Sequence, residues 1–360
     1  MRHRCYTTLL LTYLIAGCAT VNPRYDASKK HHRPDGFNNN YIDNWRDGQP
    51  SFWAWQWDRW TTGLPAQDPS RVKSVTPDLA YLKSNTRDVS VTWIGHSTAL
   101  WQLNGLNILT DPQFSERASP FSFAGPRREV ALPMKLADLP RIDVVLISHN
   151  HYDHLDRQSV LQLKQQPGGP PLFIVPLGLD IWLNNEGITN VRPLDWWDSF
   201  SVKVPHGEVT VHLVPSQHWS SRTPWDRNAT LWGGFVAQAT VEGEPYSMFF
   251  SGDTGYSKDF AEIGQKFGGF DFSQIAVGCY LPRWFMRDQH INEEEALRIH
   301  LDVKSKFSIG VHWGTFRLCD DPIDAPLDAL PKARKQLAVD DAAFVLLALG
   351  QTHILRRSAR

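Results

Sequence analysis

The chain has 360 residues, with 37 basic and 38 acidic side chains, 14 histidines and 15 tryptophans. Because the net charge is close to zero, a protein that binds nucleic acid through a broadly basic surface is excluded. The hydrophobic fraction of 42% is that of a globular protein, which excludes wholesale disorder.

The N-terminus is typical of an export signal. Two arginines lie within residues 1–4, and a short apolar run follows at residues 9–15. This run is shorter than the roughly 20 apolar residues that a membrane-spanning helix needs. Residues 14–18 resemble a bacterial lipobox, so we expect a lipoprotein signal peptide at residues 1–17 and lipid modification of Cys18. An ordinary signal peptide or a buried N-terminal strand is the alternative.

Two segments follow before the regular pattern begins. Residues 18–50 are mostly polar, and we expect them to form a tether between the membrane and a domain at residues 51–360. Residues 52–60 (FWAWQWDRW) are rich in tryptophan. They predict either an aromatic patch packed on the core or an element at the membrane interface.

From residue 88 onward, short apolar or alternating runs predict strands and longer amphipathic runs predict helices. Asn104 and Gly105 between two of these runs predict a hairpin turn. The expected strands are 89–94, 99–103, 106–110, 143–148, 172–175, 209–214, 231–239, 246–251, 275–278, 307–311 and 344–349. The expected helices are 157–165, 177–186, 258–267, 292–304 and 328–337. Strands dominate both halves, which favours an α/β fold with two sheets between helical layers, an αββα four-layer sandwich.

Three histidines and an aspartate fall within six positions directly after the expected strand 143–148. They are His149, His151, Asp153 and His154. Imidazole nitrogens and carboxylate oxygens are the usual zinc ligands, and a loop at a strand end can aim several of them at one point. The density of the string argues against a merely solvated histidine-rich loop.

Three other expected strands each end on one further candidate ligand. These residues are His218, Asp253 and His312. Each alone would more often be structural, but their repetition beside the histidine string predicts one metal site assembled from several strand ends. Cys279 and Cys319 either form a disulfide in an oxidising envelope or stay as thiols, and the sequence leaves this open.

The chain resembles the metallo-β-lactamase fold and, more closely, the phospholipase D family that hydrolyses N-acyl-phosphatidylethanolamines. The resemblance extends over about residues 93–316. It is carried by the strings VTWIGHST, LTDPQFSERASP, VLISHNHYDHLD, PLDWWD, PSQHW, SGDTGY, PRWFM, QHINEEEALRIHLDV and HWGTF. Leu281 and Gln351 depart from the family, which usually has glutamate at both positions, so acyl-chain and headgroup preference stay open.

The resemblance implies two zinc ions. The first would be held by His149, His151 and His218, and the second by Asp153, His154 and His312, with Asp253 bridging them. Two metal ions of this kind stabilise the attacking and the leaving oxygen of an in-line displacement. Zinc also lowers the pKa of bound water to about 7, so no serine or cysteine nucleophile is needed.

The resemblance also assigns roles around the metals. Asp111 matches the aspartate that orients a ligand imidazole in this fold, and His96 either acts likewise or is a buried structural histidine. Tyr152 and His290 match residues that face the substrate. His290 would contact the phosphate or protonate the leaving alkoxide, whereas a surface histidine before a helix is the alternative. Asp253 and His290 are thus the expected catalytic residues.

These features together imply a zinc-dependent phosphodiesterase that hydrolyses N-acyl-phosphatidylethanolamine to N-acylethanolamine and phosphatidic acid. The alternatives are a hydrolase of another ester or a lactone, and a non-catalytic zinc-binding envelope lipoprotein. We expect a phospholipid substrate, the membrane as a partner through the lipid anchor, and no nucleic acid, and we leave a homodimer open. The expected location is the bacterial cell envelope, at the outer membrane if the host has one.

Overall fold

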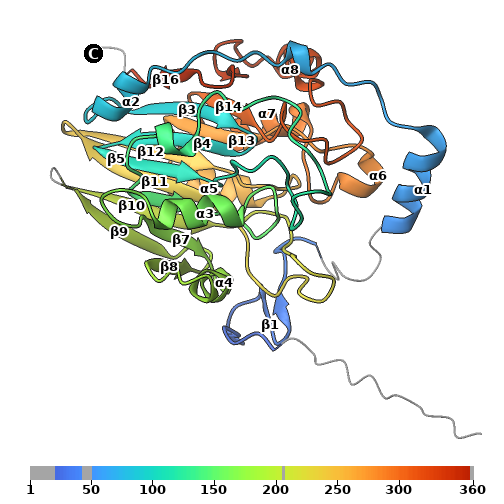
Figure 1. Cartoon of the computed structure of the whole chain (residues 1–360), viewed down its shortest axis with the longest axis horizontal. Coiled ribbons are helices and arrows are strands. Elements are labelled where there is room, and N and C mark those ends of the chain that lie inside the picture. The colour runs from blue at the N-terminus through green and yellow to red at the C-terminus, as the bar shows by residue number, and fades with distance from the viewer. Residues whose placement is uncertain (1–20, 43–50, 205–206, 357–360) are drawn as a thin grey trace, which may run out of the picture.

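The computed structural model describes residues 21–42, 51–204 and 207–356. The predicted signal peptide and Cys18 lie outside these residues, so both stay predictions. Figure 1 shows two stacked β-sheets with helices on their outer faces, which confirms the expected αββα arrangement. None of the described helices is long and apolar enough to cross a membrane.

The first sheet has seven strands in the order β16-β3-β4-β5-β6-β7-β8. Its strands are β3 (Ser90–Gly95), β4 (Thr98–Leu103), β5 (Leu106–Thr110), β6 (Val144–Leu146), β7 (Leu172–Pro176), β8 (Val191–Leu194) and β16 (Thr352–Ile354). The expected hairpin joins β4 and β5, and Asn104 and Gly105 at its turn both have positive φ, as a two-residue hairpin of this type requires.

The second sheet also has seven strands, in the order β15-β14-β13-β12-β11-β10-β9. Its strands are β9 (Ser199–Val204), β10 (Gly207–Val214), β11 (Gly234–Val241), β12 (Glu244–Phe250), β13 (Phe272–Ala276), β14 (Ser308–Val311) and β15 (Phe344–Val345). β8, β9 and β16 were not expected, and all three lie at sheet edges.

Helices lie on both outer faces and at one end of the sandwich (Figure 1). They are α1 (Phe52–Thr62), α2 (Leu79–Ser84), α3 (Arg157–Lys164), α4 (Leu179–Asn185), α5 (Asp259–Phe267), α6 (Arg283–Met286), α7 (Glu293–Asp302) and α8 (Pro326–Leu337), with short 3-10 turns at Pro69–Arg71 and Leu136–Asp138. The five expected helices are α3, α4, α5, α7 and α8. Apolar side chains of α2, α3 and α4 form one core with the first sheet, and α7 packs on β13 and α8.

Strand β6 shows why the runs that precede the candidate ligands are continuously apolar. Val144 and Leu146 face the core between the sheets, whereas Val145 and Ile147 face the core under the helices. Side chains alternate along a strand, so a strand covered on both faces needs apolar residues at every position. The chain turns polar only where β6 ends, and the histidine string begins there.

Residues 21–42 are folded on the domain, where we expected a tether at residues 18–50. They form a small hairpin of β1 (His32–Arg33) and β2 (Gly36–Phe37). The Phe37 side chain is only 1% exposed and belongs to the core between the sheets. The polar side chains that predicted a tether instead pair with polar groups of the domain.

The tryptophan-rich run forms α1, which lies beside α6 (Figure 1). Trp55 is buried, stacks on Phe285 and donates a hydrogen bond to Asp320. Trp53 and Trp60, in contrast, are 78% and 76% exposed. One face of this helix therefore packs on the domain, while the other presents tryptophans outward.

Candidate metal centre

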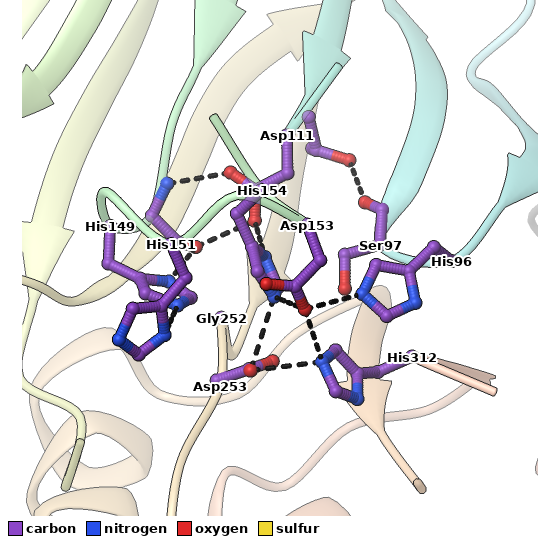
Figure 2. Close-up of polar contacts among 12 residues, drawn as sticks. His96, Ser97, Asp111, His149, His151, Asp153, His154, Gly252, Asp253 and His312 are labelled. Atoms are coloured by element: carbon purple, nitrogen blue, oxygen red, sulfur yellow. Dashed lines mark hydrogen bonds and ion pairs between the residues drawn. The ribbon is translucent and has the colours of Figure 1, made fainter. Parts of the chain in front are cut away.

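The predicted ligands gather at one end of the sandwich, where strands of both sheets stop (Figure 2). The string that begins at His149 follows β6, and His312 directly follows β14. His218 and Asp253 come a few residues after β10 and β12. Asp156 then caps α3 by accepting from two backbone N–H groups, which ends the ligand loop. The structure thus brings together every residue that the sequence predicts as a ligand.

One group consists of three imidazoles. The candidate ligand nitrogens of His149, His151 and His218 all lie within 4.8 Å of one another. His149 Nε2 is 2.8 Å, and His218 Nε2 is 3.3 Å, from His151 Nδ1. Burial lowers the pKa of His151 and of His218 to about 3 and holds the pKa of His149 well below its ordinary value, so all three rings are neutral. Converging neutral imidazoles are a donor set for a cation.

The second group adds carboxylates. His154 Nε2 lies 3.1 Å from Oδ2 of Asp153 and 3.1 Å from Oδ2 of Asp253. His312 Nε2 lies 3.3 Å and 3.0 Å from the same two atoms. Asp253 Oδ2 is also 3.9 Å from Nε2 of His218, so this carboxylate stands between the two groups. Its other oxygen, Oδ1, is buried without a hydrogen-bond partner among the described residues.

The electrostatics of the second group demand positive charge. Burial alone would raise the pKa of Asp253, but His154 and His312 outweigh it and hold that pKa well below its usual range. Burial alone would lower the pKa of His312, but Asp253 and Asp153 raise it to about 9. Buried carboxylates at this distance need a cation. Without a bound metal, protonated imidazoles supply the positive charge that these carboxylates need. Metal cations fit the same donor set.

A layer of hydrogen bonds orients the imidazoles. Asp111 Oδ2 accepts from His154 Nδ1 at 2.7 Å and from the Ser148 hydroxyl at 2.6 Å. The same hydroxyl lies 2.9 Å from His149 Nδ1 and accepts from it. Each bond occupies Nδ1 and leaves Nε2 directed at the centre. Asp111 therefore lies at the position that its predicted role requires, behind His154 (Figure 2).

Several backbone positions at the centre are strained. His96 and His312 have φ of 51° and 65°, a region that residues other than glycine rarely adopt. The His312 N–H donates to the His96 carbonyl at 3.0 Å, which ties the two together. His96 Nε2 lies 2.9 Å from Asp153 Oδ2, so this histidine contacts a candidate ligand. Gly252 has φ of 59°, and a Cβ there would lie 2.8 Å from a backbone oxygen.

A cavity of about 390 Å³ opens on the centre and is lined by Asp153, Asp253 and His312. His290 also lines it, with Nδ1 3.8 Å from Asp253 Oδ2 and without a hydrogen-bond partner among the described residues. The rest of the lining is mostly apolar and includes Phe52, Trp55, Trp219, Phe285, Leu318 and the disulfide between Cys279 and Cys319. The cavity is therefore polar beside the candidate ligands and mostly apolar along the rest of its wall.

Tyr152 lies elsewhere. Its ring packs under the guanidinium of Arg222, 4.0 Å from the ring centre, and its hydroxyl donates to the Arg222 carbonyl at 3.0 Å. It lines a separate cavity of about 470 Å³ rather than the one described above. The structure does not bring Tyr152 to the same cavity as His290, and its contact with substrate stays a prediction.

Sequence reasoning missed two residues that support the ligand loops. Arg222 donates to the carbonyls of Asn150 and Leu155, at 2.8 Å and 2.9 Å, and so holds the loop that carries the histidine string. Asn39 hydrogen-bonds the backbone of His218. Both side chains belong to segments without regular pattern, and their partners are far along the chain, so no signal in the sequence points to them.

Comparisons with known proteins agree with this geometry. The Beta-lactamase superfamily domain matches residues 106–313. An N-acyl-phosphatidylethanolamine-hydrolyzing phospholipase D of Caenorhabditis elegans is 40% identical over 293 residues, covering 78% of this chain and 79% of that protein. The mitochondrial protein of the same description from Saccharomyces cerevisiae is 38% identical over 241 residues, covering 66% of this chain and 50% of that protein.

A solved structure, described as a possible metal-dependent hydrolase from Veillonella parvula, covers 74% of this chain and 100% of its own, with a TM-score of 0.57 and 18% identity. It supports the fold alone. The superfamily match spans more than half of the chain, and the worm relative is similar over most of its length. The chain therefore belongs to the metallo-β-lactamase superfamily, within the family of N-acyl-phosphatidylethanolamine-hydrolysing phospholipases D, and is a metal-dependent hydrolase.

Proposed function

We propose that the protein is a zinc-dependent phosphodiesterase that hydrolyses N-acyl-phosphatidylethanolamine to N-acylethanolamine and phosphatidic acid. The observation that carries the proposal is the pair of ligand groups with Asp253 between them, at the polar end of a cavity with apolar walls. The hydrolysis of N-acyl-phosphatidylethanolamine for which the worm and yeast relatives are named supports the substrate class.

The donor set fits two cations. His149, His151 and His218 would hold one, and Asp153, His154 and His312 the other, with Asp253 shared. Nitrogen and oxygen donors of this kind suit zinc, and iron or manganese accept them too. When bound, such a pair supplies Lewis acidity toward a phosphate and activates water for attack.

The remaining residues bind and orient the lipid. His290 lies at the cavity wall beside Asp253, where its unpartnered nitrogen can donate a hydrogen bond to a phosphate oxygen. Phe52, Trp55 and Phe285 offer apolar walls to acyl chains. Water adds to phosphorus, the bond from phosphorus to the ethanolamine oxygen breaks, and the leaving oxygen takes up a proton. The products are phosphatidic acid and N-acylethanolamine.

The most informative experiment is mass spectrometry of a defined lipid panel after incubation with purified protein. N-acyl-phosphatidylethanolamine should yield N-acylethanolamine, whereas phosphatidylethanolamine without the N-acyl group tests headgroup preference. Asp253→Asn, which has similar volume but no negative charge to share between cations, is the matched control and should be inactive. Turnover of a lactone or a simple ester, with no phosphodiester cleaved, would refute the proposal. It would favour the alternative function, a hydrolase of another ester or a lactone.

The metal count is tested separately. We expect about two zinc ions per chain in the wild type and fewer in Asp253→Asn, measured by elemental analysis after removal of free metal. A fully active preparation that contains no metal would refute the mechanism. One tightly held ion with full activity would refute the shared role of Asp253.

Membrane attachment is also a proposal. Lipid modification of Cys18 would hold the enzyme at its substrate in the bacterial cell envelope, and more than one acyl chain makes such an anchor stable. Trp53, Trp57 and Trp60 are exposed on α1, the helix whose Phe52 and Trp55 line the cavity, and they support an orientation of this helix toward the bilayer. Labelled fatty acid should enter the wild type and not Cys18→Ala. Equal labelling of both would rule out the anchor.

A further inference from the structure

The N-terminal segment, residues 21–42, is a strap held on the domain by polar contacts. Arg24 pairs with Asp180 of α4, and a larger attachment follows at Asp195, directly after β8. This carboxylate pairs with Lys29 and lies 2.7 Å from His31 Nε2 and 2.9 Å from His32 Nε2. The cluster has the residue types of a metal site. However, Lys29 already balances the charge of the Asp195 carboxylate, and the Asp26 N–H donates to His32 Nδ1. We therefore assign this cluster a structural role, as a clasp that holds the strap on the domain.

A further attachment of the strap is the loop that contains Asn228. The Phe37 N–H donates to the Asn228 carbonyl at 2.9 Å, and the Phe37 side chain enters the core. Gly36 has φ of 154°, and a Cβ there would lie 2.2 Å from the same carbonyl oxygen. Only glycine permits this approach. The strap is thereby fixed just before it reaches the metal centre.

Asn39 is the next residue of the strap with a long-range contact. Its Oδ1 accepts from the His218 N–H at 3.0 Å, and its Nδ2 donates to the His218 carbonyl at 3.0 Å. The side-chain amide thus pairs with both polar groups of one residue, as a neighbouring strand would. Asn39 is only 5% exposed and His218 is 0% exposed, so water does not replace these bonds.

His218 depends on this pairing because it lies beyond the end of β10, where the ladder of the sheet no longer holds it. Within the described part of the chain, the hydrogen bonds of its backbone N–H and carbonyl are those with Asn39. The ring is held separately, because its Nδ1 lies 2.9 Å from the Gln289 carbonyl and donates to it. Asn39 therefore fixes where the residue is, and Gln289 fixes how its ring is turned.

We propose that Asn39 is a positioning residue of the metal centre, which acts by fixing the backbone of His218. The proposal rests on the proposed role of His218 as a metal ligand. Removing an outer partner of a ligand typically weakens metal binding by about 10- to 100-fold. We therefore expect Asn39→Ala to weaken binding of one of the two metal ions by at least about 10-fold and to leave the other nearly unchanged.

The test uses the full chain and zinc alone as the probe. Purified wild type, Asn39→Ala and Asn39→Asp are titrated with zinc against a chromophoric chelator, and cobalt-loaded samples are compared by visible absorption. Asn39→Asp keeps the acceptor for the His218 N–H but loses the donor to its carbonyl, so its loss should be intermediate. Asn40→Ala is the matched control, because the Asn40 amide donates at 2.7 Å to Asp259 and touches no candidate ligand.

The outcomes separate this inference from the proposed function. A wild type that binds no metal would defeat the metal centre itself. A wild type that binds two ions, with both Asn39 variants as tight as Asn40→Ala and with the same cobalt spectrum, would overturn the role of Asn39 alone. Weaker binding and an altered cobalt spectrum in the Asn39 variants, with thermal unfolding of the metal-free proteins equal to that of Asn40→Ala, would support it. Should Asn39→Ala not fold, Asn39→Asp decides by the same criteria.

Discussion

Replacing Arg222 by methionine tests whether one side chain holds the histidine string in place. The Arg222 guanidinium donates to the carbonyls of Asn150 and Leu155 and lies over the rings of Tyr152 and Trp182. Methionine keeps much of the apolar stem but removes the charge and both hydrogen bonds. Two buried carbonyls would then lose their partner, in the loop that supplies four candidate ligands.

The magnitude follows from these contacts. A hydrogen bond from a charged donor contributes about 1.5–3 kcal/mol, and a desolvated contact of a cation with an aromatic ring about 2 kcal/mol. Burial lowers the pKa of Arg222, but the guanidinium stays protonated and its desolvation offsets part of the gain. We therefore expect Arg222→Met to lower the free energy of unfolding by about 3–5 kcal/mol. Metal affinity should fall by at least about 10-fold.

The assay is urea unfolding of the metal-free protein together with a zinc titration. Arg222→Lys keeps a positive charge, but its side chain is shorter and its nitrogen does not reach the place of Nη1, which donates to both carbonyls, so about half of the loss should remain. Arg157→Met is the matched control, because Arg157 pairs with Glu186 while 59% of its side chain is exposed, and such pairs contribute less than about 1 kcal/mol. Equal stability of Arg222→Met and Arg157→Met would mean that Arg222 does not hold the histidine string in place.

Three further predictions concern single positions. Asp111 Oδ2 accepts from His154 and from the Ser148 hydroxyl, while Oδ1 accepts from the Ser148 N–H. Asp111→Asn turns one of these oxygens into an amide NH2 that cannot accept, so zinc binding should weaken by about 10- to 100-fold, and an unchanged affinity in a zinc titration would contradict this role. Gly252→Ala forces a Cβ to within 2.8 Å of a carbonyl at φ of 59°, and denaturant unfolding should show a loss of about 1–3 kcal/mol rather than none. Burial raises the pKa of Glu293 from 4.5 to about 7, so the folded protein binds that proton more tightly than the unfolded chain does. Stability should therefore fall by up to about 3 kcal/mol as the pH rises from about 4.5 to about 7, and Glu293→Gln should flatten this part of the profile in unfolding measured across pH, with a parallel profile arguing against the cause.

The candidate ligands were predictable because their signal is local. Each of His149, His218, Asp253 and His312 comes after a strand that is recognisable from its apolar run. Strands buried on both faces end where polar residues begin, so the sequence marks the end of each one. Because the ends of these strands lie at one edge of the sandwich, the ligands that follow them come together in one site.

The missed features depend on distant partners or on weak patterns. Asn39 and the clasp residues occur in a polar segment, and composition alone cannot distinguish a tether from a segment whose polar groups pair 160 or more residues away, as His31 does with Asp195. β9 was missed because an edge strand exposes much of its surface, and β8 carries Pro193, which strands tolerate mainly at edges. The position of the Tyr152 side chain depends on its contacts with Arg222, and no sequence motif predicts them.

We propose that water attacks the phosphorus of an N-acylated phospholipid beside Asp253, where the two ligand groups would hold metal ions that activate it. Hydrolysis of N-acyl-phosphatidylethanolamine in water enriched in oxygen-18, followed by mass spectrometry of both products, tests it most directly. We predict that the label enters phosphatidic acid and is absent from N-acylethanolamine. Label in the N-acylethanolamine would mean attack on carbon, and release of diacylglycerol would mean cleavage of the other phosphoester bond. Either result would exclude attack of water on phosphorus with release of N-acylethanolamine.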